Sequence, residues 1–391
     1  MSFEKPYEGL RVVDLSQGVA GPYCAMLLAR QGADVIKVEP LDGDWSRILA
    51  PFYGNQTAYS IPANIGKRSL AVDLKSDAGK AIVERMLPTA DVFLEGFRPG
   101  VIDRLGFSYD RLSALNEALI YVSISGFGQE GPLRTKPAMD PVLQAFTGFM
   151  AENKGPDGIP HRTPTIINDM STALYAQQAV GAALYVRRDE ARGRRINVSL
   201  LEASANLQAI RLMGAYRDGP FKPGMAPNGV FDTAEGWIQI VVIRDHDFVK
   251  FCTALGRDEL GTDARFALAE GRRENAETLY EIVRPILNER PAAYWRDLFT
   301  EAGLQNEVVQ SYEEFVNHPH VKETGLISWI TQEGSDTPWA VPNIPGLPRL
   351  DPESLSDLAP RNGQHTREIL SELDYSDTDI EKLLSDGVVG V

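Results

Sequence analysis

Cysteine and histidine are scarce in this sequence. Its 391 residues include two cysteines, Cys24 and Cys252, and five histidines. Two distant cysteines cannot form the disulfide framework of a small secreted protein, nor a cysteine-based zinc site. The histidines form no HExxH motif and no pair at metal-binding spacing. These absences argue against a bound metal and favour the reducing cytoplasm as the compartment.

Long apolar runs and an excess of positive charge are missing as well. No run approaches the ~20 residues of a membrane-spanning helix, and the opening MSFEKPYEGL lacks the apolar stretch of a secretory signal. The chain has 39 Lys and Arg against 54 Asp and Glu, a net charge of −15. Such a surface disfavours nucleic acid and membranes as partners. A polyanionic ligand would have to be held by a local group of cations.

Nucleotide-binding motifs are weak or absent. One GxGxxG run, Gly126–Gly131, follows a predicted strand. A dinucleotide fingerprint should then open a helix, but Pro132 and Pro137 follow here. The first strand–helix turn, SQGVAG at 16–21, also lacks the required glycine spacing, and there is no GxxxxGK[ST] and no GxSxG. These features disfavour NAD binding, P-loop phosphoryl transfer and serine hydrolysis.

Predicted strands and helices alternate in the N-terminal half of the chain. We expect strands at 10–15, 34–38, 69–73, 91–95, 119–123 and 195–200, and helices at 23–31, 77–87, 109–116 and 171–188. This alternation predicts an α/β fold with a doubly wound, Rossmann-like parallel sheet. A ligand should bind at the carboxyl ends of its strands.

The pattern changes after a stretch rich in Gly and Pro. Residues 217–228 are predicted to be a linker, and 229–330 a second, smaller α+β domain that begins with an antiparallel hairpin. Residues 331–342 are expected to be a return linker. The large domain would then consist of 1–216 and 343–391, with both chain ends in it.

Basic residues lie next to several predicted strand ends. Lys37 ends one strand, Lys75 follows another, Arg98 and Arg104 bracket the turn after a third, and Lys136 lies beyond a fourth. The loops after parallel strands meet at one edge of a sheet, so these cations indicate a polyphosphate site. Scattered surface solvation is the alternative interpretation of the same positions.

Asp169 ends an extended stretch, 163–168, directly before the long helix predicted at 171–188. An Asp at such a position usually caps the helix. The positive field of a helix N-terminus also favours the ionised carboxylate, and a positioned carboxylate can act as a covalent acyl acceptor. The residues alone leave both roles open.

Several runs, in one order along nearly the whole chain, resemble the class III CoA-transferases, the family of formyl-CoA transferase and carnitine CoA-transferase. The matching runs include DLSQGVAGPYCAMLLARQGADVIKVEP within 10–39, NIGKRSLAVDLK at 64–75, ADVFLEGFRPGVIDRLGF at 90–107, SISGFGQEGP at 123–132 and NGQHTREILSEL at 362–373.

The resemblance implies a CoA-transferase whose nucleophile is Asp169. It also implies that CoA and acyl-CoA are substrates, that a small carboxylic acid is the other substrate, that no cofactor is tightly bound, and that two chains form a homodimer of interlocked rings. The CoA contacts carried over from the family are Gln17, Lys37, Val72, Lys75, Phe97, Arg98, Arg104 and, more loosely aligned, Lys136.

A related activity, acyl-CoA racemisation, uses a His-Asp pair in the loop after the GFGQ-type run. This sequence has Met139-Asp140 at that place, which disfavours a racemase. Intramolecular CoA transfer on the same scaffold and a non-catalytic CoA-binding protein are further alternatives. The sequence does not indicate which acids are exchanged.

Overall fold

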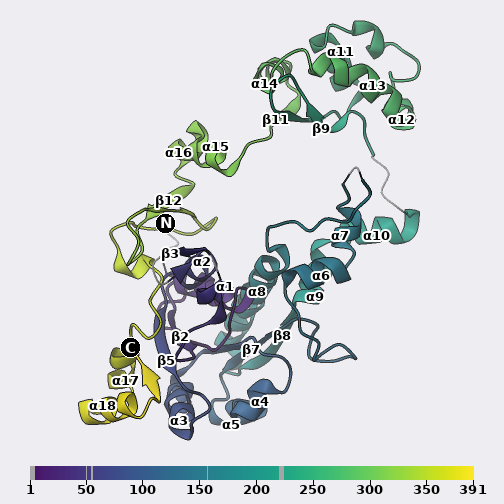
Figure 1. The fold of residues 1–391 in the computed structure, drawn as a ribbon. Coiled ribbons are helices and arrows are strands. Elements are labelled where there is room, and N and C mark those ends of the chain that lie inside the picture. Colours follow the sequence, from purple (N-terminus) through teal and green to yellow (C-terminus); the bar gives the residue numbers. More distant parts are fainter. Residues whose placement is uncertain (1–4, 50, 54–55, 156, 220–223) are drawn as a thin grey trace. The chain divides into compact units, whose positions relative to one another are not determined.

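The computed structural model describes residues 5–49, 51–53, 56–155, 157–219 and 224–391. The chain divides into two compact units, Met1–Met213 with Gly325–Val391 and Gly214–Thr324 (Figure 1). The predicted linker 217–228 begins inside helix α10 (Ala209–Asp218), and its residues 220–223 lie outside the described residues. The predicted return linker 331–342 falls in the larger unit and includes strand β13 (Trp339–Pro342).

The larger unit is built on a seven-stranded sheet in the order β14-β5-β2-β1-β6-β7-β8. All neighbouring pairs are parallel except β14, which pairs antiparallel with β5. The prediction of a purely parallel sheet was therefore wrong at this edge. The strands are β1 (Arg11–Asp14), β2 (Asp34–Glu39), β5 (Arg68–Val72), β6 (Val92–Glu95), β7 (Ile120–Ser125), β8 (Arg194–Ser199) and β14 (Val389–Gly390).

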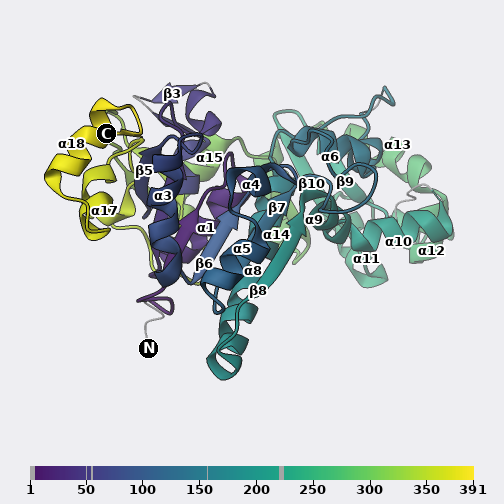
Figure 2. The ribbon, with the colours of Figure 1, turned by 90° about the horizontal axis from the view of Figure 1, so that it is seen from below.

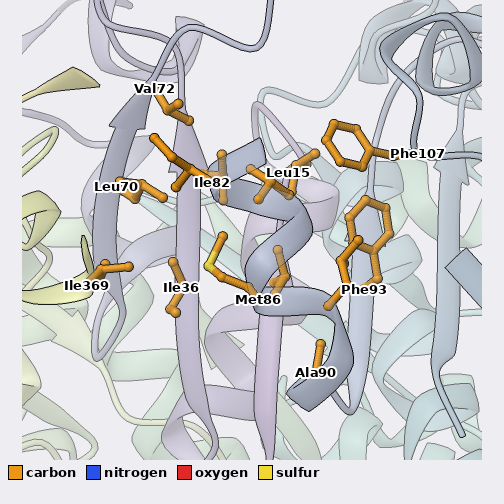
Figure 3. Packing of buried hydrophobic residues seen from close by; sticks show 14 of the residues in the cluster. Leu15, Ile36, Leu70, Val72, Ile82, Met86, Ala90, Phe93, Phe107 and Ile369 are labelled. Atoms are coloured by element: carbon orange, nitrogen blue, oxygen red, sulfur yellow. The ribbon is translucent and has the colours of Figure 1, made fainter. Parts of the chain in front are cut away.

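Helices cover both faces of this sheet because consecutive strand residues point to opposite faces. Val12 packs with α1 (Ala20–Arg30), α8 (Ile167–Glu190) and α9 (Leu200–Leu207) on one face. Val13 packs on the other face with α3 (Asp77–Met86), α5 (Tyr109–Leu115), α17 (Thr366–Glu372) and α18 (Asp377–Ser385). Figure 3 shows Ile82 and Met86 of α3 over the strand residues Ile36, Leu70 and Phe93.

The C-terminal segment completes this larger unit. Helices α17 and α18 lie beside β5 and α3 at one edge of the sheet (Figures 1 and 2). The remaining elements of the unit are η1 (Trp45–Ile48), β3 (Phe52–Tyr53), β4 (Gln56–Thr57), α2 (Ser60–Asn64), η2 (Leu87–Thr89), α4 (Val101–Leu105), α6 (Asp140–Phe146), α7 (Phe149–Glu152), β12 (Ile327–Ile330), which pairs with β13, and η4 (Leu355–Asp357).

The smaller unit has a three-stranded antiparallel sheet in the order β11-β10-β9. The predicted hairpin is confirmed as β9 (Asn228–Asp232) and β10 (Trp237–Val241), and β11 (Gln305–Val308) adds an edge that the sequence pattern did not indicate. The helices of the unit are α11 (Asp245–Ala254), η3 (Asp258–Gly261), α12 (Ala269–Glu274), α13 (Ala276–Leu287), α14 (Ala292–Glu301), α15 (Tyr312–Asn317) and α16 (Pro319–Thr324).

Helix α8 begins earlier than predicted. It starts at Ile167, so Asp169 is the third residue of the helix rather than a residue before it. The N-cap residue, Ile166, has no side chain that could accept a hydrogen bond from the first turn. The first turn must therefore be capped from elsewhere in the chain.

Candidate active site

Asp169 opens into a cavity at the carboxyl ends of the central strands. The cavity has a volume of about 490 Å³ and is called the Asp169 cavity below. Gln17 follows β1, Gly96 follows β6 and Ser125 ends β7, and all three line it. The chain reverses its strand order between β1 and β6, so the cavity lies at the topological switch point where doubly wound sheets bind ligands.

A second cavity, of about 440 Å³, lies beside the first and is called the Lys75 cavity. Val72 and Lys75, at and after the end of β5, line it together with residues that follow β2. Gln17 and Phe97 line both cavities. The two cavities therefore form neighbouring parts of one groove-like site across the ends of β5, β2, β1, β6 and β7.

The carboxyl group of Asp169 has a raised pKa. Burial, followed by the negative charge of Asp140, raises the pKa of Asp169 to about 7. The net shift is thus opposite to the one that the helix N-terminus alone would produce, because burial and Asp140 both disfavour the charged form. A carboxyl group that titrates near neutral pH in a cavity is typical of a functional site.

Asp140 is the missing cap of α8. Its buried carboxylate accepts hydrogen bonds from the backbone N–H of Asn168 at 2.6 Å and of Asp169 at 3.3 Å. The side-chain amide of Gln144 donates to the same carboxylate at 2.5 Å. Asp140 thus orients the first turn of α8, and with it Asp169, and its charge acts on the Asp169 carboxyl group. In the sequence, Asp140 stood out only as part of the Met139-Asp140 pair at the place of the racemase motif.

The predicted cations occupy different places. Arg98 lines the Asp169 cavity and Lys75 the Lys75 cavity. Arg104, near the end of α4, and Lys136 are exposed and line neither cavity. The ammonium group of Lys136 lies 5.3 Å from the ring centre of Phe127, a cation–π distance.

Lys37 is the predicted CoA contact whose position does not fit that role. Its side chain is fully buried, and its ammonium group donates to the carbonyl oxygen of Ser16 and to Asp44. Burial opposes the charge, but Asp44 and Asp14 outweigh it and raise the pKa of Lys37. Because Lys37 is fully buried and lines neither cavity, its ammonium group is not placed to contact a phosphate of CoA.

Other residues of the Asp169 cavity were not predicted as site residues from the sequence. Trp45, Ser125 and Met139 all line it. Gly18 explains the position of Trp45, because a Cβ atom on Gly18 would lie 2.2 Å from the Trp45 ring, and Gly18 has a φ of +82°. A glycine followed by a distant tryptophan carries no recognisable signal in one sequence.

The described residues contain no group of three or more His, Cys, Asp or Glu side chains placed to hold a metal ion. Cys24 and Cys252 are both buried and free. None of the described helices is both long and apolar enough to cross a bilayer. The cytoplasmic location stays a prediction from cysteine usage.

Comparison with known proteins places this chain in a family. A profile described as "CoA-transferase family III" matches residues 7–366. The chain belongs to CoA-transferase family III. It is therefore an enzyme of the transferase class that uses CoA thioesters as substrates.

Named relatives act on different acids. The acetyl-CoA:oxalate CoA-transferase of Acetobacter aceti is 35% identical over 365 residues, which cover 88% of this chain and 93% of that protein. The succinyl-CoA:glutarate CoA-transferase of Mus musculus is 32% identical over 398 residues, which cover 98% and 90%. The crystal structure of Rv3272 from Mycobacterium tuberculosis, orthorhombic form, matches with a TM-score of 0.84 at 30% identity and covers 93% of this chain and 99% of that one.

Proposed function

We propose that this family III transferase moves CoA from an acyl-CoA thioester to a free carboxylic acid through covalent intermediates on Asp169. The Asp169 carboxylate attacks the thioester carbonyl, the C–S bond breaks, and CoA leaves as a thiolate. The product on the enzyme is a mixed anhydride. The thiolate then attacks the aspartyl carbonyl of that anhydride, which releases the donor acid and leaves an aspartyl-CoA thioester.

The second half repeats these steps with the acceptor. The acceptor carboxylate attacks the aspartyl thioester and expels the thiolate, and the thiolate attacks the acceptor carbonyl of the new anhydride. Acyl-CoA forms and the Asp169 carboxylate returns. Each step conserves an activated acyl group, so ATP is not needed.

The observation that carries this proposal is the placement of Asp169 in a cavity that continues into a second, cation-containing one. CoA is a long molecule with a reactive thiol at one end and phosphates with a nucleotide at the other. We propose that the thiol end lies in the Asp169 cavity and the nucleotide in the Lys75 cavity, past Gln17 and Phe97. Val72 and Lys75 would contact the nucleotide, and Arg98 and Arg104 the phosphates, with Lys136 beyond them.

Racemisation receives no support from this site. Met139 lines the Asp169 cavity where the racemase pattern has histidine, and no histidine is among the residues that line it. The carboxylate of Asp140 accepts the hydrogen bonds that cap α8. Neither residue offers a proton-shuttling imidazole next to the acyl group.

Trapping with hydroxylamine tests the covalent step. The purified protein is incubated with a panel of acyl-CoA thioesters and hydroxylamine, digested and analysed by mass spectrometry. An anhydride or thioester at the carboxyl group reacts to a hydroxamate, which adds about 15 Da. We expect this label on Asp169 and only with accepted donors. Transfer of CoA to an acid without any label on Asp169 would contradict the covalent route.

We also propose that the protein is a homodimer. Helices α8, α9 and α10 expose several large apolar side chains, namely Leu174, Tyr185, Leu207, Ile210 and Met213. A second copy would remove these side chains from water. Light scattering in solution should give about twice the chain mass of 43.1 kDa. A mass that stays at that of one chain at micromolar concentration would contradict the dimer.

A further inference from the structure

Six buried charged side chains form three ion pairs, Lys67–Asp14, Lys37–Asp44 and Arg47–Glu39. They are three carboxylates and three cations, each at most 6% exposed: Asp14, Glu39, Asp44, Lys37, Arg47 and Lys67. Their formal charges cancel. Buried ion pairs of this kind contribute little net stability, because desolvation offsets their attraction. A role in holding one local geometry is the better-attested reason for such a group.

Asp44 is the centre of this network. The Asp44 carboxylate accepts hydrogen bonds from two backbone N–H groups. The N–H of Gly18 lies 2.9 and 3.0 Å from its two oxygens, and the N–H of Ser46 lies 2.9 Å from one of them. The Lys37 ammonium group donates to it at 2.9 Å. Asp44 therefore links the loop after β1 to the turn that begins η1 by hydrogen bonds. Lys37 neutralises the negative charge of the Asp44 carboxylate that accepts them.

The same pair fixes two residues of the cavity wall. Lys37 also donates to the carbonyl oxygen of Ser16, so the residues on both sides of Gln17 are anchored, Ser16 by Lys37 and Gly18 by Asp44. Trp45 directly follows Asp44, and its ring packs against Gly18. Gln17 and Trp45 both line the Asp169 cavity.

We infer that the Lys37–Asp44 pair is a positioning device that holds Gln17 and Trp45 so that the cavity wall keeps water from the activated aspartyl group. The inference rests on the proposed covalent route. Water that reached the aspartyl-CoA thioester would add to its carbonyl and break the C–S bond. Asp169 would return as a carboxylic acid and CoA would leave with a proton as the free thiol, so the thioester would be lost without a new acyl-CoA.

Two variants and a matched control test this role. Lys37→Met removes the cation at similar length, and Asp44→Asn removes the charge but keeps an oxygen acceptor. Arg187→Met removes a cation that bonds a carboxylate, Asp91, at 2.7 Å and a backbone carbonyl at 3.1 Å. Arg187 lies 18 residues after Asp169 on α8, about 27 Å along the helix axis, and lines neither cavity.

The measured quantity is the ratio of free CoA thiol released to new acyl-CoA formed. It is measured below the melting temperature of each variant, with folding checked by circular dichroism. We expect at least a fivefold higher ratio for Lys37→Met and a smaller rise for Asp44→Asn, with Arg187→Met at the wild-type ratio. A ratio in both variants equal to that of Arg187→Met would overturn the inference. If Lys37→Met does not fold, Asp44→Asn decides alone.

Affinity for CoA separates this inference from the proposed function. Because Gln17 lines both cavities, a loosened wall should weaken binding of CoA itself at least tenfold relative to Arg187→Met, as measured by calorimetry. If the wild-type protein transfers CoA to no acid, the proposed function is wrong. The CoA affinities of the variants then test by themselves whether the Lys37–Asp44 pair positions Gln17 and Trp45. Equal affinities in all three variants would then overturn the positioning role.

Discussion

Asp169→Ala is expected to abolish CoA transfer while CoA still binds. In the proposed route the variant loses the carboxylate that forms the anhydride, and loss of a covalent nucleophile costs roughly 10³- to 10⁶-fold in kcat. CoA affinity should stay within a few-fold, because Gln17, Lys75 and Phe97 remain along the two cavities. Steady-state kinetics by chromatography of acyl-CoA products, together with calorimetric titration of CoA, measure both quantities.

A matched control comes from another helix. Asp77 lies in the first turn of α3 as Asp169 lies in that of α8, but its side chain is fully exposed to solvent and away from both cavities. Asp77→Ala should leave kcat near the wild-type value. An Asp169→Ala variant with turnover like that of Asp77→Ala would show that the nucleophile lies elsewhere.

The pH dependence of transfer is the second large expected effect. The attacking form of Asp169 is the carboxylate, and its pKa is raised to about 7 by burial and by Asp140. The ionised fraction, and with it kcat/KM, should fall about tenfold for each pH unit below that value and level off above it. A profile of kcat/KM from pH 5 to 9 measures the midpoint in the free enzyme.

Two variants test whether the midpoint of the pH profile belongs to Asp169. Asp140→Asn removes the neighbouring negative charge and should move it to lower pH. Burial also raises the pKa of Glu95 to about 7, so Glu95→Gln is the control, and it should leave the midpoint in place. A midpoint that shifts in Glu95→Gln but not in Asp140→Asn would contradict the assignment to Asp169.

The same pKa predicts the sign of a stability effect. A carboxyl group whose pKa is raised in the folded state stabilises the fold at low pH, and this contribution is lost as pH rises through about 7. Ionised Asp169 therefore lowers the stability of the fold, although the proposed chemistry requires this form. This sign is opposite to that of an ordinary exposed Asp that caps a helix.

The sequence by itself determined the doubly wound larger unit and the region of the site. The alternation of short apolar strands with helices was enough to predict the mostly parallel sheet. The loops after parallel strands meet at one sheet edge, and this placed Lys75 and Arg98 there. Gln17, Val72 and Phe97 came from the family resemblance. The nucleophile and the family came from resemblance of whole motifs rather than from any physical pattern.

Only the tertiary structure decided which charges face the cavities and which lie under them. Lys37 and Lys75 look alike in the sequence, each at a strand end, yet one is fully buried and the other exposed at a cavity. The capping of α8 by Asp140 joins residues 28 positions apart, and the antiparallel β14 pairs the C-terminus with β5. Such contacts depend on long-range packing and on desolvation, and neither quantity is encoded in local spacing along the chain.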